Sequence, residues 1–183
     1  MTNDGAGVSA VLRAFERDGA GWRQVFGPTD VHIGAEGFSH GFSESNTHSP
    51  IGYYTLSRAF GNSADPGAKL PYHRVRYGDR WVDQSSSPNY NTLQSADADE
   101  TKGAGEALWT VRPEYDYGVA VDYNTAPAVP GAGSAVFLHV TDGRPTAGCV
   151  SMPMDQMVAL LRWLSPSMSP RIAMGPLTDV LSM

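Results

Sequence analysis

The sequence predicts a mainly β protein with one convincing helix. The 183-residue chain contains 20 glycines and 13 prolines, which divide most of it into short segments. Short segments between turn residues are typical of strands. Apolar residues recur convincingly at helical spacing only after the cysteine, near the C-terminus. The chain is long enough for one well-buried core and shows no internal repeat or interdomain linker. We therefore expect residues 1–183 to form a single domain.

Strands are expected from the start of the chain. The first two flank the turn Asp18-Gly19 and form an opening pair. The candidate strands, in order, cover residues 8–15, 21–26, 31–34, 52–58, 72–77 with 80–82, and 118–123.

The segment from Ser134 to Val140 differs from the other candidates because its apolar residues occupy both phases of the strand alternation. A strand that is apolar on both faces is a central, covered one. The alternation places His139 on the same face as Phe137. We therefore expect a buried strand that carries a histidine.

The expected helix follows at residues 153–164. Pro153 suits a first helical turn, and Ser165-Pro166 ends the segment. The apolar residues at helical spacing are Met157, Leu160, Leu161 and Leu164. The helix begins only a few residues after Cys149. We expect the helix dipole to make only a minor contribution to stabilising a thiolate on Cys149, because the effect fades within about one turn.

The segment from Gln84 to Glu106 is polar and contains almost no apolar residue. Such long surface loops are either functional lids or merely mobile. We expect this one to be mobile in the free protein unless it packs over a cleft through Tyr90, Leu93 or Trp109.

Composition excludes several classes of partner. The formal net charge is −6 and no basic stripe is visible, so we expect no nucleic-acid partner. No stretch approaches the roughly 18 apolar residues of a membrane-spanning helix. The first residues lack the basic and apolar regions of a secretory signal, which fits either a cytoplasmic protein or a chain whose leader has been removed. A single cysteine excludes an internal disulfide and does not choose between these compartments.

Cys149, the only cysteine, follows His139 by ten residues (149 − 139 = 10). A thiol becomes a strong nucleophile when an imidazole takes its proton. Acyl transfer needs such a nucleophile, a base that later returns the proton, and donors for the developing oxyanion. We therefore assign Cys149 as nucleophile and His139 as base and acid. The backbone N–H groups of Gly148 and Cys149 are natural oxyanion donors.

Other groups near this pair have open roles. Tyr123, or less so Tyr117, can supply a side-chain oxyanion donor, although Tyr123 also fits a packing aromatic. Arg144 can meet a substrate carboxylate or simply be solvated. The group that orients His139 is either Asp142 or a backbone carbonyl.

Each assignment has a structural alternative. Cys149 can be a small inert hydrophobe, and His139 can be a satisfied core histidine. A zinc site is not expected, because the candidate ligands lack the paired spacing of structural zinc motifs; they are His32, His40, His48 and Glu44. The tryptophans are expected in the core or a cleft; they are Trp22, Trp81, Trp109 and Trp163.

These residues carry a resemblance to a known family. Residues 133–139 read Gly-Ser-Ala-Val-Phe-Leu-His, residues 146–150 read Thr-Ala-Gly-Cys-Val, and a short helix follows. This region, about residues 133–164, resembles the catalytic region of the YkuD-type L,D-transpeptidases. Upstream, residues 47–54 read Thr-His-Ser-Pro-Ile-Gly-Tyr-Tyr and are similar to a strand entry of that family.

The chain departs from the family pattern at three points. Ala147 stands where the common motif has a second histidine, and Val140 stands where Gly or Ser follows the first. The spacing between His139 and Cys149 is also short for the family. Thr146 can replace the serine of the motif, which makes it a candidate site residue. The pattern is that of a divergent branch with a trimmed loop.

The resemblance implies a β-sandwich of mixed sheets with a short helix beside the nucleophile. It also implies acyl transfer on peptidoglycan stem peptides, sensitivity to carbapenems, no metal or organic cofactor, and a location in the periplasm or cell wall. We expect a monomer. Two alternatives remain: hydrolysis of the same stems, as a carboxypeptidase or endopeptidase, and a non-catalytic peptidoglycan-binding domain, for which Ala147 is the argument.

Overall fold

The computed structural model describes residues 1–3, 7–95 and 105–183. Its main sheet contains β1 (Thr2–Asn3), β2 (Ser9–Asp18), β3 (Gly21–His32), β6 (Gly52–Gly61), β7 (Tyr72–Arg74), β11 (Gly118–Val121), β12 (Phe137–Val140), β13 (Val150–Met152) and β14 (Arg171–Pro176). The smaller pairings use β4 (Phe38–Ser39), β5 (Ser49–Pro50), β8 (Arg80–Trp81), β9 (Leu93–Gln94) and β10 (Glu106–Ala107). The helices are α1 (Met154–Trp163) and α2 (Leu177–Val180), with single 3-10 turns η2 (Leu108–Thr110), η3 (Glu114–Asp116) and η4 (Pro166–Met168).

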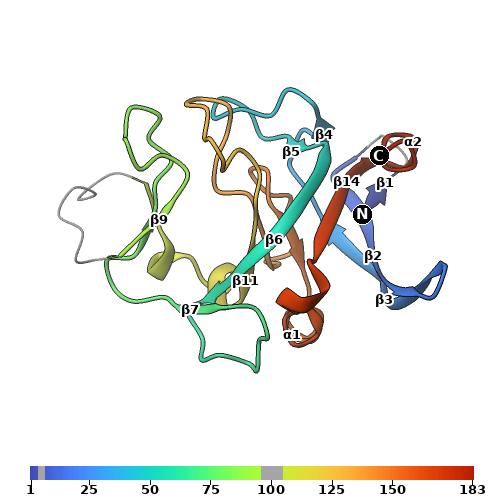
Figure 1. Cartoon of the computed structure of the whole chain (residues 1–183). Helices are drawn as coiled ribbons and strands as arrows, with labels where there is room; N and C mark the ends of the chain where they lie inside the picture. Colours follow the sequence, from blue (N-terminus) through green and yellow to red (C-terminus); the bar gives the residue numbers. More distant parts are fainter. Residues whose placement is uncertain (4–6, 96–104) are drawn as a thin grey trace.

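The main sheet is mixed and curls on itself. Within the described residues its order is β11-β12-β13-β3-β2-β1-β14-β6-β7, and β11 also pairs with β6 (Figure 1). This additional pairing joins β11, at one end of the order, to a strand near the other end. The prediction of a mainly β protein with mixed sheets is confirmed, and the architecture is consistent with a β-sandwich-like fold.

The opening strand pair is confirmed and is longer than predicted. β2 and β3 are antiparallel from Asp18 opposite Gly21 to Ser9 opposite His32. The strand predicted at 31–34 is not separate, because β3 continues through this region to His32. Both termini lie on the same side of the molecule, where β1 runs parallel to β14 (Figure 1).

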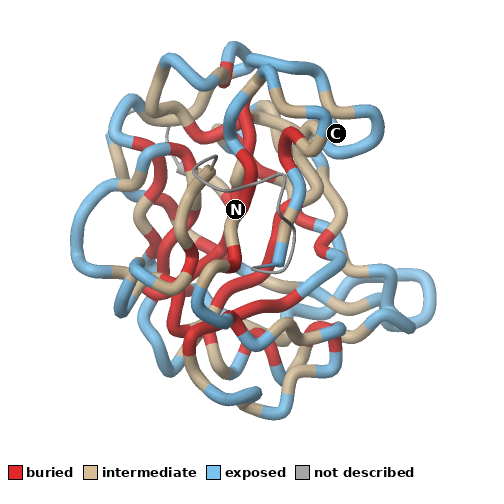
Figure 2. The backbone as a smooth tube through the Cα atoms, turned by 90° about the vertical axis from the view of Figure 1, so that its left-hand side faces the viewer, coloured by how far each residue is buried: buried red, intermediate tan, exposed pale blue. Residues whose placement is uncertain are grey.

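β12 is the central strand that the two-phase apolar pattern predicted. It lies between β11, with Gly118 opposite His139, and the parallel strand β13, with Leu138 opposite Val150. All four of its residues are buried. Leu138 and Val140 belong to the larger apolar core, and Phe137 belongs to a second cluster on the other face. Figure 2 shows the buried segments running through the middle of the molecule, with exposed segments around them.

The helix after the cysteine is confirmed. α1 begins at Met154, five residues after Cys149 (154 − 149 = 5), and its inner face adds three buried side chains to the larger core. These side chains are Met157, Leu160 and Leu161. The second helix, α2, was not predicted and is a single turn.

The polar segment is more anchored than its composition suggested. β9 and β10 pair with opposite edges of β8 and form a three-stranded sheet. Tyr90 and Asn91 are each only 4% exposed. Tyr90 therefore anchors this part of the segment, through a hydrogen bond to Glu44 of the cavity wall, and mobility of the segment stays a prediction. The rest of that prediction, on residues 96–104, falls outside the described residues.

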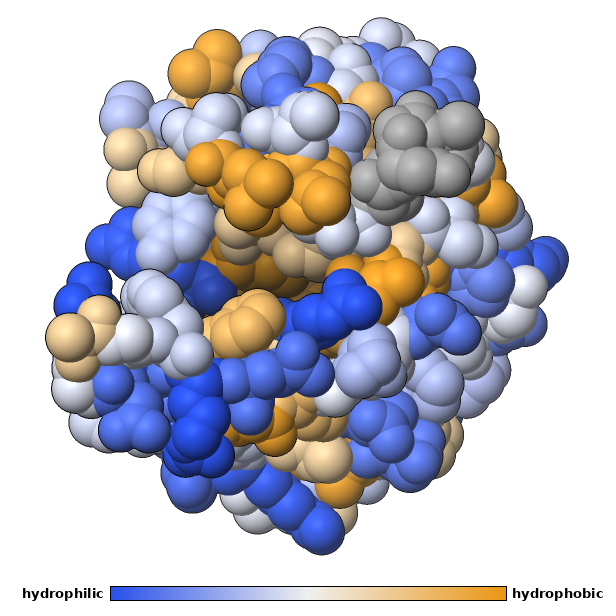
Figure 3. Space-filling view, turned by 90° about the vertical axis from the view of Figure 1, so that its right-hand side faces the viewer, coloured by the Kyte–Doolittle hydropathy of each residue, from blue (hydrophilic) through white to orange (hydrophobic). Residues whose placement is uncertain are grey.

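One surface feature corrects a prediction. Trp22 is 65% exposed on the β2–β3 hairpin, where the Arg17 guanidinium lies over its ring, so it is neither a core nor a cleft residue. Figure 3 shows the face of the molecule that carries this hairpin, with apolar residues gathered around a shallow hollow and hydrophilic residues around them. Over the part of the chain that the structure describes, no helix combines the length and apolar character needed to cross a membrane.

Candidate active site

Cys149 lines a cavity of about 390 Å³. Three chain segments form most of its wall: residues 42–47, the pair Ser134 and Ala135 before β12, and residues 147–149 before β13. The remaining lining residues are Asp83, Glu106 and Tyr115. The cavity therefore collects parts of the chain that are far apart in sequence around the only thiol.

The sulfur of Cys149 is held by backbone groups. The thiol donates to the carbonyl oxygen of Ala135 at 3.2 Å, and Sγ accepts the N–H of Phe137 at 3.4 Å. Burial, and to a smaller extent the nearby Glu106 carboxylate, together raise the pKa of the Cys149 thiol to about 12, against the effect of the Phe137 N–H. In this arrangement the sulfur is a protonated thiol.

His139 lies on the same face of the sheet, one step along β12. In the parallel pairing of β12 with β13, Leu138 lies beside Val150 and His139 lies beside Ser151. Because side chains alternate between the two faces of a sheet, Phe137 and His139 point away from the face of Leu138. By the same alternation Cys149, one residue before Val150, lies on the face of Phe137 and His139. The histidine is 6% exposed. The strand register therefore brings the two predicted catalytic residues to one side of the sheet.

The backbone orients the His139 ring. Its Nδ1 lies 2.7 Å from the carbonyl oxygen of Val140, which can only accept, so Nδ1 carries the proton. The neutral ring then has Nε2 as its free proton acceptor. Burial lowers the pKa of His139, which favours this neutral form. Of the two orienting groups that the sequence left open, the structure has the backbone carbonyl.

No hydrogen bond joins the side chains of Cys149 and His139 among the described residues, and His139 is not one of the described residues that line the cavity. The Tyr115 ring meets the His139 ring edge-on at 5.4 Å between centroids and also contacts Phe137. A proton transfer from the thiol to the imidazole therefore requires Cys149 to leave the carbonyl of Ala135 by rotating about its side-chain bond.

Side-chain hydroxyls fix the turn that carries Cys149. Thr146 Oγ1 donates to the carbonyl of Cys149 at 2.6 Å and accepts the N–H of Gly148 at 3.2 Å. Ser49 Oγ donates to the carbonyl of Gly148 at 2.8 Å and accepts the N–H of Gly34 at 2.9 Å. Thr146 thus holds the turn. The N–H of Gly148 must release its hydrogen bond to Thr146 before it can donate to an oxyanion.

Gly148 is required at its position for two reasons. Its φ of +144° lies in a region that other residues rarely adopt, and an added Cβ would lie 2.8 Å from the Phe42 ring and 3.0 Å from the carbonyl oxygen of His48. We expect Gly148→Ala to lower the free energy of unfolding by about 2 kcal/mol, measured by urea denaturation. Gly143→Ala is the control, since Gly143 also has a positive φ, +87°, but open space at Cβ. Equal losses in both variants would contradict the steric argument.

Three of the predicted oxyanion or substrate-binding residues, Thr146, Tyr123 and Arg144, are not among the described residues that line the cavity. The Tyr123 hydroxyl donates to the carbonyl of Ala132 at 2.6 Å, and its ring packs edge-on against Phe42. The Arg144 side chain is 77% exposed, and its Nε donates to Asp142 at 2.6 Å. Tyr123 thus has the contacts of the packing alternative, and Arg144 is held by the carboxylate that was a candidate for orienting His139.

A comparison with protein-family models decides the classification. The L,D-transpeptidase catalytic domain model, YkuD, matches residues 10–172, which is most of the chain. The chain belongs to this family. Comparisons with curated proteins and with solved structures gave no match. The resemblance predicted from the motifs around His139 and Cys149 is therefore confirmed.

Some residues of this L,D-transpeptidase domain were missed by sequence reasoning. Asn91 accepts the N–H groups of Trp81 and Ala135 and donates to the carbonyl of Tyr123, which fixes the cavity wall beside Cys149. Tyr115 donates to Glu106 at 2.9 Å and contacts His139. An Asn in a polar loop and a Tyr in an irregular segment carry no periodic signal, so only the tertiary structure reveals them.

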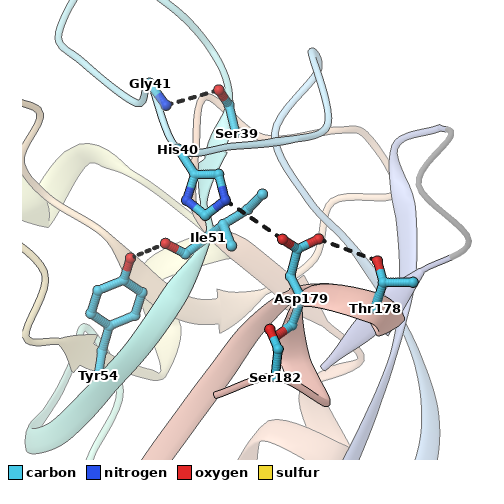
Figure 4. A network of polar contacts seen from close by, with 8 residues as sticks. All are labelled: Ser39, His40, Gly41, Ile51, Tyr54, Thr178, Asp179 and Ser182. Carbon is cyan, nitrogen blue, oxygen red and sulfur yellow. Dashed lines mark hydrogen bonds and ion pairs between the residues drawn. The ribbon is translucent and has the colours of Figure 1, made fainter.

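The histidines considered as metal ligands do not converge. No group of three or more potential ligands occurs among the residues that the structure describes. His40 lies on the surface, with Nε2 3.6 Å from Asp179, in a network that includes Thr178 (Figure 4). Glu44 instead lines the cavity and accepts a hydrogen bond from Tyr90. His40 and Glu44 therefore lie in different places, each with its own partner, while the buried Nδ1 atoms of His32 and His48 have no hydrogen-bond partner among the described residues.

Proposed function

We propose that this domain transfers acyl groups from peptidoglycan stem peptides through a thioester on Cys149. One observation carries the proposal: the only thiol lines a cavity on the same sheet face as His139, whose Nδ1 is bound to a backbone carbonyl and whose Nε2 is available as a base. Membership of the L,D-transpeptidase family supports the reaction class and the peptidoglycan substrate.

The first half-reaction forms the thioester. The thiol of Cys149 rotates away from Ala135 and gives its proton to Nε2 of His139. The thiolate then attacks the carbonyl carbon before the terminal D-amino acid of a tetrapeptide stem. When the C–N bond breaks, the imidazolium returns the proton to the leaving amine. We assign the N–H groups of Cys149 and of Gly148, once released from Thr146, as donors to the developing oxyanion.

The second half-reaction transfers the acyl group. An amine of a neighbouring stem, or of a free D-amino acid, attacks the thioester while His139 takes its proton. The C–S bond breaks, and the thiolate of Cys149 recovers the proton from the imidazolium. The product is a cross-link between two third-position diamino acids, or an exchanged stem terminus. No metal or organic cofactor takes part in this sequence.

One observation favours a second candidate, a non-catalytic peptidoglycan-binding domain. The thiol is hydrogen-bonded to Ala135, and its pKa is raised to about 12, so the resting sulfur is not a nucleophile. Acyl transfer requires the histidine to compensate for this burial in the substrate complex. A binding domain requires no such change.

Covalent labelling separates these two candidates. A carbapenem acylates active enzymes of this reaction type, so we expect the intact mass of the protein to increase by the mass of one carbapenem. A binding domain with an inert thiol would keep its original mass. Product analysis with a tetrapeptide stem, with and without an added amine acceptor, then separates transfer from hydrolysis. A transferase uses the added amine, whereas a hydrolase passes the acyl group to water in both samples.

The proposed substrate also implies a location. Peptidoglycan lies outside the cytoplasmic membrane, so the domain would act in the periplasm or the cell wall, and its family membership supports this.

A further inference from the structure

Both hydrogen bonds of the Cys149 sulfur involve one short stretch of chain. The thiol donates to the carbonyl of Ala135, and the N–H of Phe137 donates to Sγ. Ala135 has a φ of +53°, in the left-handed region that residues with a Cβ rarely adopt. A residue keeps such a conformation only where its surroundings hold it. The resting position of the sulfur therefore depends on the group that holds Ala135.

The side chain of Asn91 holds Ala135. Its Oδ1 accepts the N–H of Ala135 at 3.1 Å and the indole N–H of Trp81 at 2.9 Å. Its Nδ2 donates to the carbonyl oxygens of Tyr123 at 2.9 Å and Asn124 at 2.8 Å. These bonds use the whole hydrogen-bonding capacity of the amide, so a flipped amide would set its NH2 group against two donors. The buried amide is thus a fixed anchor for the backbone at Ala135.

The backbone of Asn91 is fixed as well. Its φ is +58°, a left-handed conformation that asparagine adopts more readily than most residues. Its N–H donates to the carbonyl of Val82 at 2.7 Å. Asn91 is not among the described residues that line the cavity. It therefore acts on Cys149 through Ala135 rather than as part of the cavity wall.

We propose that Asn91 is a positioning residue, which keeps the Cys149 thiol bonded to Ala135 and so sets how readily the thiol turns to His139. A hydrogen bond from the thiol to a carbonyl stabilises the neutral thiol and opposes the thiolate. Rotation away from Ala135 is the first step of the proposed function, and the inference rests on that function for its catalytic meaning. Asn91 thereby sets the fraction of Cys149 that is ready to react.

The S–H stretching band in the infrared spectrum reports this contact directly. Because Cys149 is the only cysteine, the band comes from one thiol. In the unmodified protein it should lie at lower wavenumber than the band of ethanethiol in carbon tetrachloride, since donating a hydrogen bond weakens the S–H bond. In Asn91→Gly the band should move toward the position of the free thiol. Glycine is the replacement because it keeps a positive φ without strain and removes only the side chain.

Asn124→Gly is the matched control. Asn124 also has a left-handed backbone, with a φ of +50°. Its side chain bonds to the N–H and the carbonyl of Val129 and to the carbonyl of Gly133, and none of these bonds involves Ala135 or Cys149. This variant should lose stability without shifting the S–H band. Equal band shifts in the two asparagine variants would overturn the proposal.

Alkylation by iodoacetamide supplies the functional readout. Loss of one hydrogen bond that favours the thiol should raise the rate of Asn91→Gly at neutral pH by a factor of about 2–10 and shift its pH profile to lower pH by about 0.4–1 unit. Asn124→Gly should react at the rate of the unmodified protein, whereas labelling through unfolding would raise both rates. Both variants keep His139, and they keep Glu106 and Tyr115, which interact electrostatically with the sulfur.

A second glycine tests the route through Ala135. Glycine adopts a positive φ without the steric penalty of alanine, so adding Ala135→Gly to Asn91→Gly should return the S–H band and the alkylation rate part of the way to those of the unmodified protein. A double variant that reacts faster than Asn91→Gly would contradict this route. If Asn91→Gly does not fold, the double variant is compared with Ala135→Gly alone, and identical bands in these two would overturn the proposal.

Acylation by a tetrapeptide stem extends the test to the reaction. Because rotation of the thiol precedes thioester formation, the maximal rate of acylation should rise about 2–10-fold in Asn91→Gly, with no change in the stem concentration that gives half of it. An unchanged S–H band and unchanged rates, with normal acylation, would overturn the role of Asn91 and leave acyl transfer intact. The expected band shift without acylation of either protein would instead support the anchoring by Asn91 and contradict the proposed function.

Discussion

Replacing Cys149 by alanine is expected to abolish covalent labelling by carbapenems and to reduce stem turnover by a factor of about 10⁴ or more. All covalent chemistry is assigned to this sulfur, and alanine has no nucleophile to replace it. The measurements are intact mass after incubation with a carbapenem and chromatography of the released D-amino acid. Cys149→Ser should be nearly as inactive, because a hydroxyl needs a stronger base than one buried imidazole.

The fold should survive this change. The sulfur makes two backbone hydrogen bonds, to Ala135 and from Phe137, and their loss affects the wall of the cavity rather than the larger core. The far-ultraviolet circular dichroism spectrum should therefore match that of the unmodified protein. An adduct that persists in Cys149→Ala would exclude Cys149 as the nucleophile.

Replacing His139 by glutamine is expected to lower the rate of iodoacetamide alkylation of Cys149 at neutral pH by a factor of about 10²–10⁴. The pKa of the Cys149 thiol is raised to about 12 in the resting site, so its reaction depends on rotation away from Ala135 and transfer of its proton to His139, and the variant lacks this base. Because only the thiolate reacts, the alkylation rate of the variant should keep rising as the pH increases through the alkaline range. In the unmodified protein the imidazole supplies reactivity at lower pH.

The pH profile distinguishes this role from packing. Glutamine keeps a polar group near Val140 and most of the side-chain volume, so we expect the variant to fold. A change in stability alone would not shift the pH profile of alkylation. Identical profiles in His139→Gln and the unmodified protein would make His139 a buried structural residue and would place the base elsewhere.

The strand and helix around the site could be predicted because their signals are local. Apolar residues in both phases identified β12 as a covered strand, and this fixed the face of His139 before any contact was known. The spacing of apolar residues gave α1 in the same way. The pair of His139 and Cys149 was recognisable because a lone thiol shortly after a strand histidine is a small, specific pattern.

The support of the site depends on contacts that no local pattern encodes. Ser49 is 99 residues from Gly148 in sequence, yet its hydroxyl fixes the turn that carries Cys149. Glu106 and Tyr115 come from segments without regular periodicity and meet the site only through the curled sheet and η3. Tyr123 shows the same limit, since the sequence left an oxyanion donor and a packing aromatic open, and only the structure shows its hydroxyl bonded to Ala132.

Trapping of the acyl-enzyme with a tetrapeptide stem tests the central claim most directly. Rapid acid quenching followed by mass spectrometry should find the protein heavier by the stem without its terminal D-amino acid. Proteolysis should place this mass on the peptide that contains Cys149, and hydroxylamine should remove it, as expected of a thioester. A protein that binds the stem but gains no mass, or that carries the mass on another residue, would contradict the account.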